Sequence, residues 1–374
     1  MDKKTLHIIA FDNPEPPTYG GIIDVFYKIK SLSGAGIEII LHIWEYGSGK
    51  KIEELENYCK EIHFYTRDTH WLSHLSIDPY IVRSRLSKRL EKRLEQDKHP
   101  ILLEGLHSCG ILRNKRLHNR TLILRAHNIE HHYYFHLAKN ETSWINKSFF
   151  LLESLKLLFF EQKAELIKHI LTVSKEDEKY FKEKYPQNNI IYLPSFQSND
   201  KVVSQEGKGD FILFHGNLEV SENNKAALYL TRHIFSKINY KVVIAGRNPS
   251  KELRQTTRKH TNIKLVSSPS IEEMRTLIQE AHIHLLYTFQ ATGLKLKLLN
   301  STFEGRHILT NEKMIRGTGL ENLVHIAKQD HEIISQIKRL MQLEFTSVEI
   351  DRRNKLLQRH YSNIKNALTI GELL

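Results

Sequence analysis

The sequence of 374 residues contains only two cysteines, Cys59 and Cys109, and their spacing matches neither a metal site nor a disulfide framework. It also lacks the roughly 20 uninterrupted apolar residues that a transmembrane helix requires. The most apolar stretch, residues 148–160, is interrupted by Glu153 and Lys156. The strand-like run near the N-terminus is too short and wrongly flanked for a signal peptide. These absences favour a protein of the reducing cytoplasm.

Acidic residues are outnumbered, with 43 Asp and Glu against 55 Lys and Arg, so the formal net charge is +12. Such an excess attracts anionic lipid, nucleotide phosphates or nucleic acid. Nucleic acid is disfavoured because the cations lack interleaved aromatic platforms and any known nucleic-acid-binding module. The excess is concentrated in residues 80–99, where the cations are Arg83, Arg85, Lys88, Arg89, Lys92, Arg93 and Lys98. This segment is either an ordinary solvated helix face or a peripheral contact with the anionic inner face of a membrane.

The chain is longer than one hydrophobic core usually holds, and two domains are therefore expected. Short apolar runs alternate with longer helical stretches, which is typical of βαβ units around a parallel sheet. The first series of predicted strands is 5–11, 38–43, 101–103, 121–126, 169–173 and 190–193. The second series is 211–215, 241–245, 263–266, 283–287 and 307–310.

These patterns predict an α/β protein with two Rossmann-like, doubly wound domains whose strand ends face each other across a cleft. The predicted first domain covers residues 1–197, and the second covers residues 211–350. A polar, glycine-containing linker is expected at 198–210. Residues 351–374 form a C-terminal helical segment, for which a return to the first domain is one alternative.

Two loops of the first domain carry candidate binding groups. Gly20 and Gly21 follow the first strand and open a helix, where free N–H groups and the helix dipole favour a phosphate or a sugar. The fourth strand ends in RAHNIEHHYY, residues 125–134, which includes His127, Asn128 and Glu130. A site that hydrogen-bonds a polyhydroxylated ligand suits these residues better than a metal site, because no ligand set of known spacing accompanies them. Histidines on an ordinary surface loop are the remaining alternative.

In the second domain, Asn217 and Arg247 follow two predicted strands, and an arginine at such a position suits a phosphate. The segment FQATGLKLKLLNSTFEGR, residues 289–306, predicts a helix with Lys295 and Lys297 in its first turn. Lysines there oppose the helix dipole, and a bound diphosphate would reconcile them with it. Asn300 and Glu304 are spaced i, i+4 and are expected on one helix face. Lysines that simply reach into solvent are the alternative.

With these motifs in order, the chain resembles the retaining glycosyltransferases of family 4, which have the GT-B architecture, over nearly its full length. The resemblance is carried by Gly20-Gly21, by His127, by the loop from Gly246 to Pro249, by the helix from Gly293 to Asn300, and by Gly319-Leu320. Two departures mark a divergent subgroup. Thr292 and Asn300 stand where the family has paired glutamates, and Asn217 and Glu222 stand where it has a basic pair.

The resemblance implies a hexosyltransferase-type, metal-independent enzyme that transfers a sugar from a nucleoside diphosphate sugar to a glycan or lipid-linked acceptor with retention, as in bacterial polysaccharide biosynthesis. No further cofactor is expected, and no Asp-x-Asp motif occurs. His127 would be catalytic, and the acceptor would bind the first domain at His107, Asn128 and Glu130. The donor phosphates would bind Gly20, Gly21, Asn217, Arg247, Lys295 and Lys297; the donor sugar or ribose would bind Thr292, Gly293, Leu294, Asn300 and Glu304. The alternative is a non-catalytic sugar-nucleotide-binding or partner subunit, which the missing glutamate pair would suit.

Overall fold

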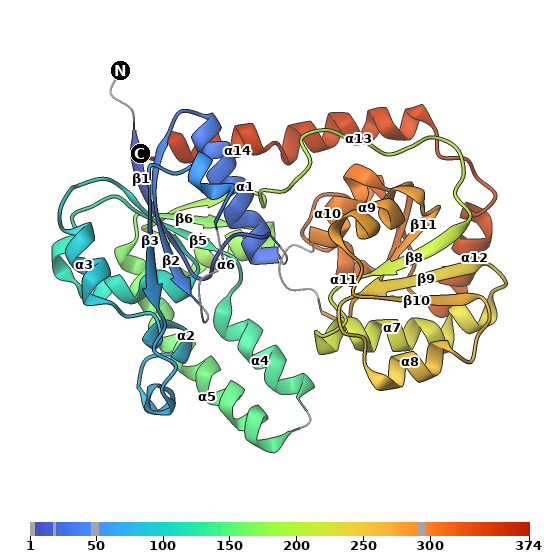
Figure 1. The fold of residues 1–374 in the computed structure, drawn as a ribbon, viewed down its shortest axis with the longest axis horizontal. Helices are drawn as coiled ribbons and strands as arrows, with labels where there is room; N and C mark the ends of the chain where they lie inside the picture. The colour runs from blue at the N-terminus through green and yellow to red at the C-terminus, as the bar shows by residue number, and fades with distance from the viewer. Residues whose placement is uncertain (1–3, 18–19, 46–51, 142, 291–295) are drawn as a thin grey trace. The chain divides into compact units, whose positions relative to one another are not determined.

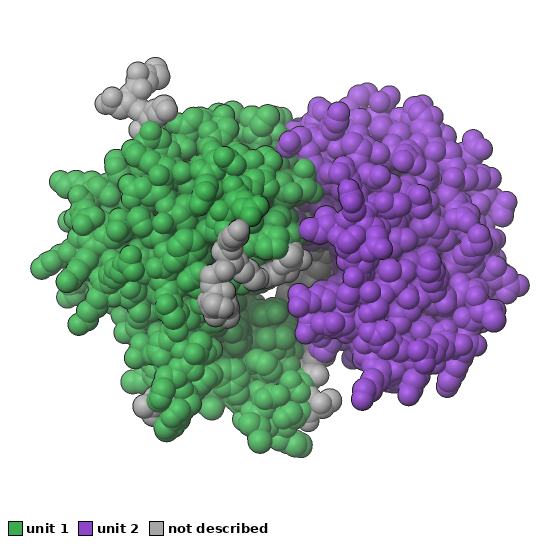
Figure 2. Space-filling view, in the orientation of Figure 1, with its two compact units in different colours: residues 1–198, 361–374 green, residues 199–360 purple. Residues whose placement is uncertain are grey.

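The structure is a computed structural model that describes residues 4–17, 20–45, 52–141, 143–290 and 296–374. Contacts divide the chain into two compact units, each with a hydrophobic core of its own (Figures 1 and 2). Unit 1 comprises Met1–Ser198 and Tyr361–Leu374, and unit 2 comprises Asn199–His360. Among the described residues, no helix has the length and apolar character needed to cross a bilayer.

Unit 1 is built on a seven-stranded parallel sheet of order β3-β2-β1-β4-β5-β6-β7 (Figure 1). Its strands are β1 (Thr5–Ala10), β2 (Glu38–Glu45), β3 (Glu61–Thr66), β4 (Ile101–Glu104), β5 (Leu122–Ala126), β6 (His169–Thr172) and β7 (Asn189–Tyr192). The central strands β1, β4 and β5 are buried throughout and mostly apolar, as a parallel sheet covered by helices requires.

The helices of unit 1 include α1 (Gly20–Gly34), α2 (Tyr80–Arg83), α3 (Lys88–Leu94), α4 (Glu130–Asn140), α5 (Trp144–Glu161), α6 (Lys175–Lys184) and α14 (Asn363–Gly371). The last helix of the sequence, α14, packs in unit 1. Its Ala367 and Ile370 are buried in the same core cluster as Val25 and Ile29 of α1. The chain therefore returns to unit 1 after the helix Ser347–His360 (α13), the return that the sequence left open for its C-terminal segment.

Unit 2 has a six-stranded parallel sheet of order β10-β9-β8-β11-β12-β13. Its strands are β8 (Phe211–His215), β9 (Lys241–Gly246), β10 (Ile263–Ser267), β11 (Ile283–Leu286), β12 (His307–Thr310) and β13 (His325–Ile326). Its helices are α7 (Ser221–His233), α8 (Lys251–Thr257), α9 (Ile271–Glu280), α10 (Leu296–Glu304), α11 (Glu312–Ile315), α12 (Asp330–Leu340) and α13 (Ser347–His360).

The predicted fold class, two doubly wound parallel-sheet domains, is confirmed. Two strands are additional to the prediction, and both are sheet edges, β3 and β13. The unit boundaries also differ from the expected ones. Residues 199–210 belong to unit 2 rather than standing apart, because the Val203 N–H donates to the Phe303 carbonyl and Gly207 forms a bridge with Phe345. Unit 2 likewise extends through α13 to His360.

Strand order reverses once in each sheet. In unit 1 the chain leaves β1 towards β2 and later returns on its other side with β4, and in unit 2 the same reversal separates β8 from β11. At such a switch point the loops after the two central strands turn to opposite faces and leave a crevice at the carboxyl ends. These are the places where each unit is expected to bind a ligand.

Candidate functional site

The switch point of unit 1 brings together the loops that follow β1, β4 and β5. The Phe11 ring lies with its centroid 5.2 Å from that of His107 and 5.6 Å from that of His127. A Cβ atom on Gly21 would come within 2.7 Å of the Phe11 ring, so the start of α1 packs directly against it. Gly105 has a φ of +69° and lies under the His107 imidazole, where a side chain would be both strained and in contact. The sequence-predicted Gly21, His107 and His127 therefore converge on one place.

A buried ionic cluster lies behind these loops. Asp24 of α1 is contacted by Arg125 of β5 through Nε and Nη2, at 3.1 and 2.9 Å. Lys28 Nζ lies 2.9 Å from Asp24 Oδ2 and 2.6 Å from Glu104 Oε1 of β4. Each of the four side chains is at most 2% exposed, and two carboxylates balance two cations.

The two carboxylates of this cluster remain ionised. Burial alone would raise the pKa of Glu104, but Lys28 and His127 outweigh it and hold the pKa below its ordinary value. The same balance, with Arg125 and Lys28 as the cations, lowers the pKa of Asp24. Near neutral pH both carboxylates can therefore accept hydrogen bonds but cannot donate them.

His127 is held by this cluster. Its Nε2 lies 2.9 Å from Glu104 Oε2, and its Nδ1 lies 3.9 Å from Asp24 Oδ2, beyond hydrogen-bond distance. Because Glu104 is ionised, the hydrogen bond requires that Nε2 carry a proton and donate it. Ligand atoms of Asp24, Glu104 and His127 lie within 4.8 Å of one another, the separation of a metal-binding set. Lys28 and Arg125 already neutralise those carboxylates, so these residues suit a metal ion poorly.

The residues predicted to bind the acceptor substrate, His107, Asn128 and Glu130, lie in two environments. The Nδ1 atom of His107 is buried without a hydrogen-bond partner among the described residues, and burial holds its pKa well below the ordinary range. His107 is thus a neutral imidazole with an unused polar atom. Glu130 is buried at the start of α4 and is hydrogen-bonded to Asn128, and burial raises its pKa to about 8. Asn128 and Glu130 thus contact each other.

The raised pKa of Glu130 gives a testable pH dependence. The folded protein keeps a proton on Glu130 that the unfolded chain releases above its ordinary pKa of 4.5, so stability falls as pH rises from there to about 8. Glu130→Gln removes this loss. Between about pH 5 and pH 8 the free energy of unfolding of the wild type should fall by about 2–4 kcal/mol more than that of the variant. Denaturant unfolding at several pH values measures it, and parallel curves for the two proteins would contradict the assignment.

At the switch point of unit 2, the start of α10 is linked through Asn223 to the loop after β8. Lys297, in the first turn of α10, donates from Nζ to Asn223 Oδ1 at 2.9 Å and lies 5.6 Å from the Phe214 ring centroid. The Oδ1 atom of Asn300, one turn later, is buried and has no hydrogen-bond partner among the described residues. Asn217 and Arg247 follow β8 and β9 and are exposed. The predicted Thr292, Gly293, Leu294 and Lys295 lie outside the described residues.

Two glutamates of unit 2 have internal partners. Glu304 accepts from Asn199 Nδ2 at 2.8 Å and lies 3.4 Å from Arg275 Nε of α9. Its carboxylate therefore already has partners in Asn199 and in α9. Glu222 of α7 accepts hydrogen bonds from the Thr288 hydroxyl and from the Gln290 N–H. It fixes the loop after β11.

Sequence reasoning did not identify the ionic cluster of unit 1. A signal was present, because Asp24 and Lys28 interrupt the apolar face of α1 at i, i+4, and Glu104 and Arg125 stand inside apolar strands. Charged residues at such positions are buried only when they are paired. That rule predicts partners, but the sequence does not say which charges meet.

The cations of the basic segment, residues 80–99, differ in their exposure to solvent. Arg85 is buried and donates from Nε to the Phe11 carbonyl, so it supports the loop after β1 rather than facing solvent. A hollow on α3 is lined by Lys88, Arg89, Lys92, Arg93 and Gln96. Membrane contact by residues 83–98 stays a prediction.

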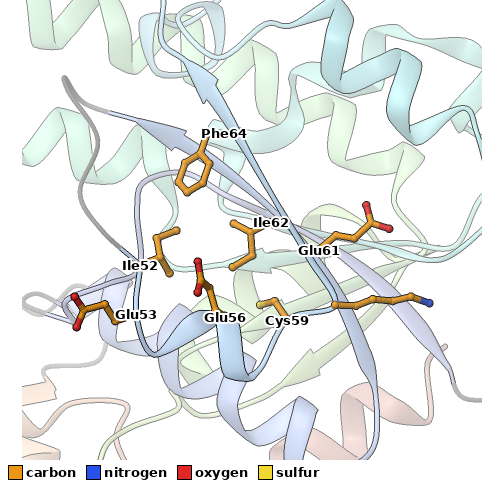
Figure 3. Close-up of a pocket in the computed structure, with 8 residues that line it drawn as sticks. Ile52, Glu53, Glu56, Cys59, Glu61, Ile62 and Phe64 are labelled. Carbon is orange, nitrogen blue, oxygen red and sulfur yellow. The ribbon is translucent and has the colours of Figure 1, made fainter.

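An open hollow lies beside the edge strand β3 (Figure 3). It is lined by Ile52, Glu53, Glu56, Cys59, Lys60, Glu61, Ile62 and Phe64. None of these residues belongs to the loops after β1, β4 or β5. The hollow therefore does not belong to the candidate site of unit 1.

Comparison with known proteins defines the class of fold. Sucrose-phosphate synthase from Thermosynechococcus elongatus is similar to this chain with a TM-score of 0.71 at 12% identity, covering 99% of this chain and 98% of the other. HepE from Anabaena, in complex with UDP and glucose, has a TM-score of 0.66 at 9% identity with the same coverage. TarM from S. aureus, in a complex that includes UDP, has a TM-score of 0.68 at 9% identity and covers 99% of each chain. The chain has the GT-B fold of these glycosyltransferases.

In sequence the chain is also similar to an uncharacterised 44.6 kDa protein in the cps region of Klebsiella pneumoniae. The two are 24% identical over 345 residues, which cover 87% of this chain and 88% of the other. No protein family model matches the chain.

Proposed function

We propose that this protein is a retaining glycosyltransferase that moves a sugar from a nucleoside diphosphate sugar to a glycan or lipid-linked acceptor. The observation that carries the proposal is the placement of Lys297 and Asn300 at the switch point of a GT-B unit. Lys297 offers a cation, and the buried Asn300 Oδ1 offers an acceptor that no described residue uses. A diphosphate and a ribose hydroxyl are the groups that match them.

In this proposal unit 2 binds the donor. Lys297 and the N–H groups at the start of α10 stabilise negative charge on the diphosphate as its bond to the sugar breaks. Arg247 is exposed and lies 3.7 Å from Glu219, so it is available to turn to the phosphates. Charge neutralisation by these groups makes a metal unnecessary. Glu304 is left out of the donor site because Asn199 and Arg275 engage its carboxylate.

Unit 1 supplies the acceptor side and His127. The proton on Nε2 is fixed by Glu104, so Nδ1 accepts a hydrogen bond from a sugar hydroxyl. His107, with its unused Nδ1, is the second polar group of the same loops. Transfer with retention needs no protein nucleophile, since the leaving phosphate takes the acceptor proton. The cps-region relative supports polysaccharide biosynthesis as the setting.

The test is donor binding and turnover by the purified chain. HepE and TarM were observed with UDP, so UDP-sugars are the first donors to screen by thermal shift. UDP release with a panel of glycan and lipid-linked acceptors then measures turnover, and NMR of the product reports the anomeric configuration. Binding without turnover on any acceptor would favour the non-catalytic sugar-nucleotide-binding subunit. Absence of nucleotide-sugar binding would contradict both.

Lys297→Ala tests the donor site. Loss of a charge-assisted hydrogen bond to phosphate should weaken donor binding by about 1.5–3 kcal/mol. Calorimetry with the nucleoside diphosphate measures the change. Lys338→Ala, at an exposed lysine in the last turn of α12, is the matched control and should bind as the wild type does. Equal affinity of the Lys297 variant and the control would remove Lys297 from the site.

A further inference from the structure

The surface of unit 1 carries an exposed apolar stripe on α5. This helix and α4 lie side by side as a hairpin that extends away from the sheet (Figure 1). The stripe begins at Trp144 and Ile145, which are 80% and 82% exposed. It continues along the same face at i, i+3, i+4 and i+7 spacing with Leu151, Leu152, Leu155, Leu158 and Phe159, all of them exposed. The opposite face buries Leu157 and Phe160 in the core of unit 1.

The segment of residues 71–80 contacts α5 and also carries exposed apolar side chains. Lys156 Nζ donates to the His74 carbonyl at 3.0 Å, and Glu153 accepts from the Tyr80 N–H at 2.6 Å. The same segment carries Trp71 and Ile77, which are 64% and 94% exposed. Large apolar side chains in such number on neighbouring elements mark an interaction surface.

The charged residues around the stripe indicate which kind of surface it suits. Of the four glutamates in residues 130–161, Glu130, Glu153 and Glu161 are buried and Glu141 is half-buried. The lysines lie at the rim of the apolar surface, where Lys139 stands over the Phe135 ring at 4.7 Å and Lys147 over the Trp144 ring at 5.3 Å. An apolar face with Trp and Leu, lysines at its edges and no fully exposed acidic group is suited to the interface of an anionic bilayer. A protein partner would also bury the leucines, but it would not require this one-sided charge.

We infer that the α5 stripe is a membrane-binding surface that inserts into the headgroup region of anionic bilayers, with Lys139 and Lys147 against the lipid phosphates. This places the principal membrane contact on α5 rather than on the basic segment of residues 83–98. The inference does not depend on catalysis, because lipid binding and sugar transfer are measured separately.

The experiment is flotation of the full-length protein with vesicles of phosphatidylcholine, with and without phosphatidylglycerol. We expect binding to the anionic vesicles that weakens with added salt. Replacing Leu152, Leu155 and Phe159 by Gln should lower the vesicle partition coefficient about a hundredfold. Replacing Lys139 and Lys147 by Gln should lower it about tenfold at low salt. The control is Ile364→Gln with Leu368→Gln, an exposed i, i+4 pair on α14 of the same unit, and it should bind as the wild type does.

Tryptophan fluorescence adds a readout that vesicle flotation alone lacks. The chain has three tryptophans, and Trp44 is buried, so Trp71→Phe leaves Trp144 as the exposed reporter. Its emission should shift to the blue on addition of anionic vesicles and be quenched by brominated lipid. An unchanged emission would overturn the inference. So would binding that is lost with Lys88→Gln and Lys92→Gln but kept in the triple Gln variant, because the basic segment would then be the contact.

A second copy of the chain is the competing occupant of the stripe. Concentration-dependent self-association of the wild type, absent in the triple Gln variant and without vesicle binding, would overturn the membrane inference. The substituted side chains are exposed, apart from the half-buried Lys147, and none belongs to the core of unit 1, so thermal unfolding and nucleotide binding should be nearly unchanged in every variant. That comparison separates a failure of this inference from a failure of the donor-site proposal.

Discussion

His127→Ala should lower turnover about a hundredfold or more, which is the range for a positioned catalytic group. In the proposed mechanism, Glu104 fixes the proton on Nε2 of His127, and Nδ1 would contact the sugar as positive charge develops at its anomeric carbon. An interaction that strengthens towards the transition state affects kcat and kcat/KM together. Binding of the nucleoside diphosphate should stay nearly unchanged, because the proposed phosphate ligand Lys297 belongs to unit 2.

The measurement is steady-state kinetics with calorimetry of nucleoside diphosphate binding in parallel. His132→Ala is the matched control, since His132 is an exposed histidine of α4 a few residues further along. Turnover near the wild-type value in the His127 variant would exclude it from the mechanism. Weaker nucleotide binding with unchanged turnover at saturation would make His127 a passive contact of the donor.

The fold was accessible from sequence because its signal is local. Runs such as Leu6–Ala10 and Ile212–Phe214 are apolar on both faces, which only buried parallel strands require. The edge strand β3 was missed because it mixes Glu61 and His63 with apolar residues and is only partly buried. The two-residue β13 is too short to leave any pattern.

The candidate site could be predicted from the sequence only in part, because some of its contacts join residues that are far apart along the chain. Gly21 and His127 could be predicted to lie near each other because each follows a predictable strand and strand ends meet at one edge of the sheet, and both contact Phe11. The pairing of Asp24 with Arg125 spans 101 residues, and no local rule specifies it. Glu304 is a second example, since helical spacing relates it to Asn300 but does not predict its contacts with Asn199 and Arg275, which come from other parts of the chain.

The buried cluster beneath the site should also determine the stability of unit 1. Asp24 accepts from Arg125 through both oxygens, from Lys28 through Oδ2 and from the Phe196 N–H through Oδ1. Asp24→Asn keeps the shape but leaves two buried cations with a single carboxylate, Glu104. Breaking a buried pair by removing one charge costs about 3–5 kcal/mol.

Unfolding by denaturant, followed by tryptophan fluorescence, measures this loss in unit 1, because Trp44, Trp71 and Trp144 all lie in that unit. Glu183→Gln is the control, since it removes an exposed carboxylate on α6 and should change stability little. The folded-state pKa of Asp24 is depressed, so its contribution is complete above the ordinary pKa of 3.8 and is lost as pH falls below it. The difference between wild type and Asp24→Asn should therefore be constant near neutral pH and shrink in acid. A variant as stable as the wild type at pH 7 would show that Glu104 alone neutralises both cations, and the positioning of His127 would then rest on Glu104 without Asp24.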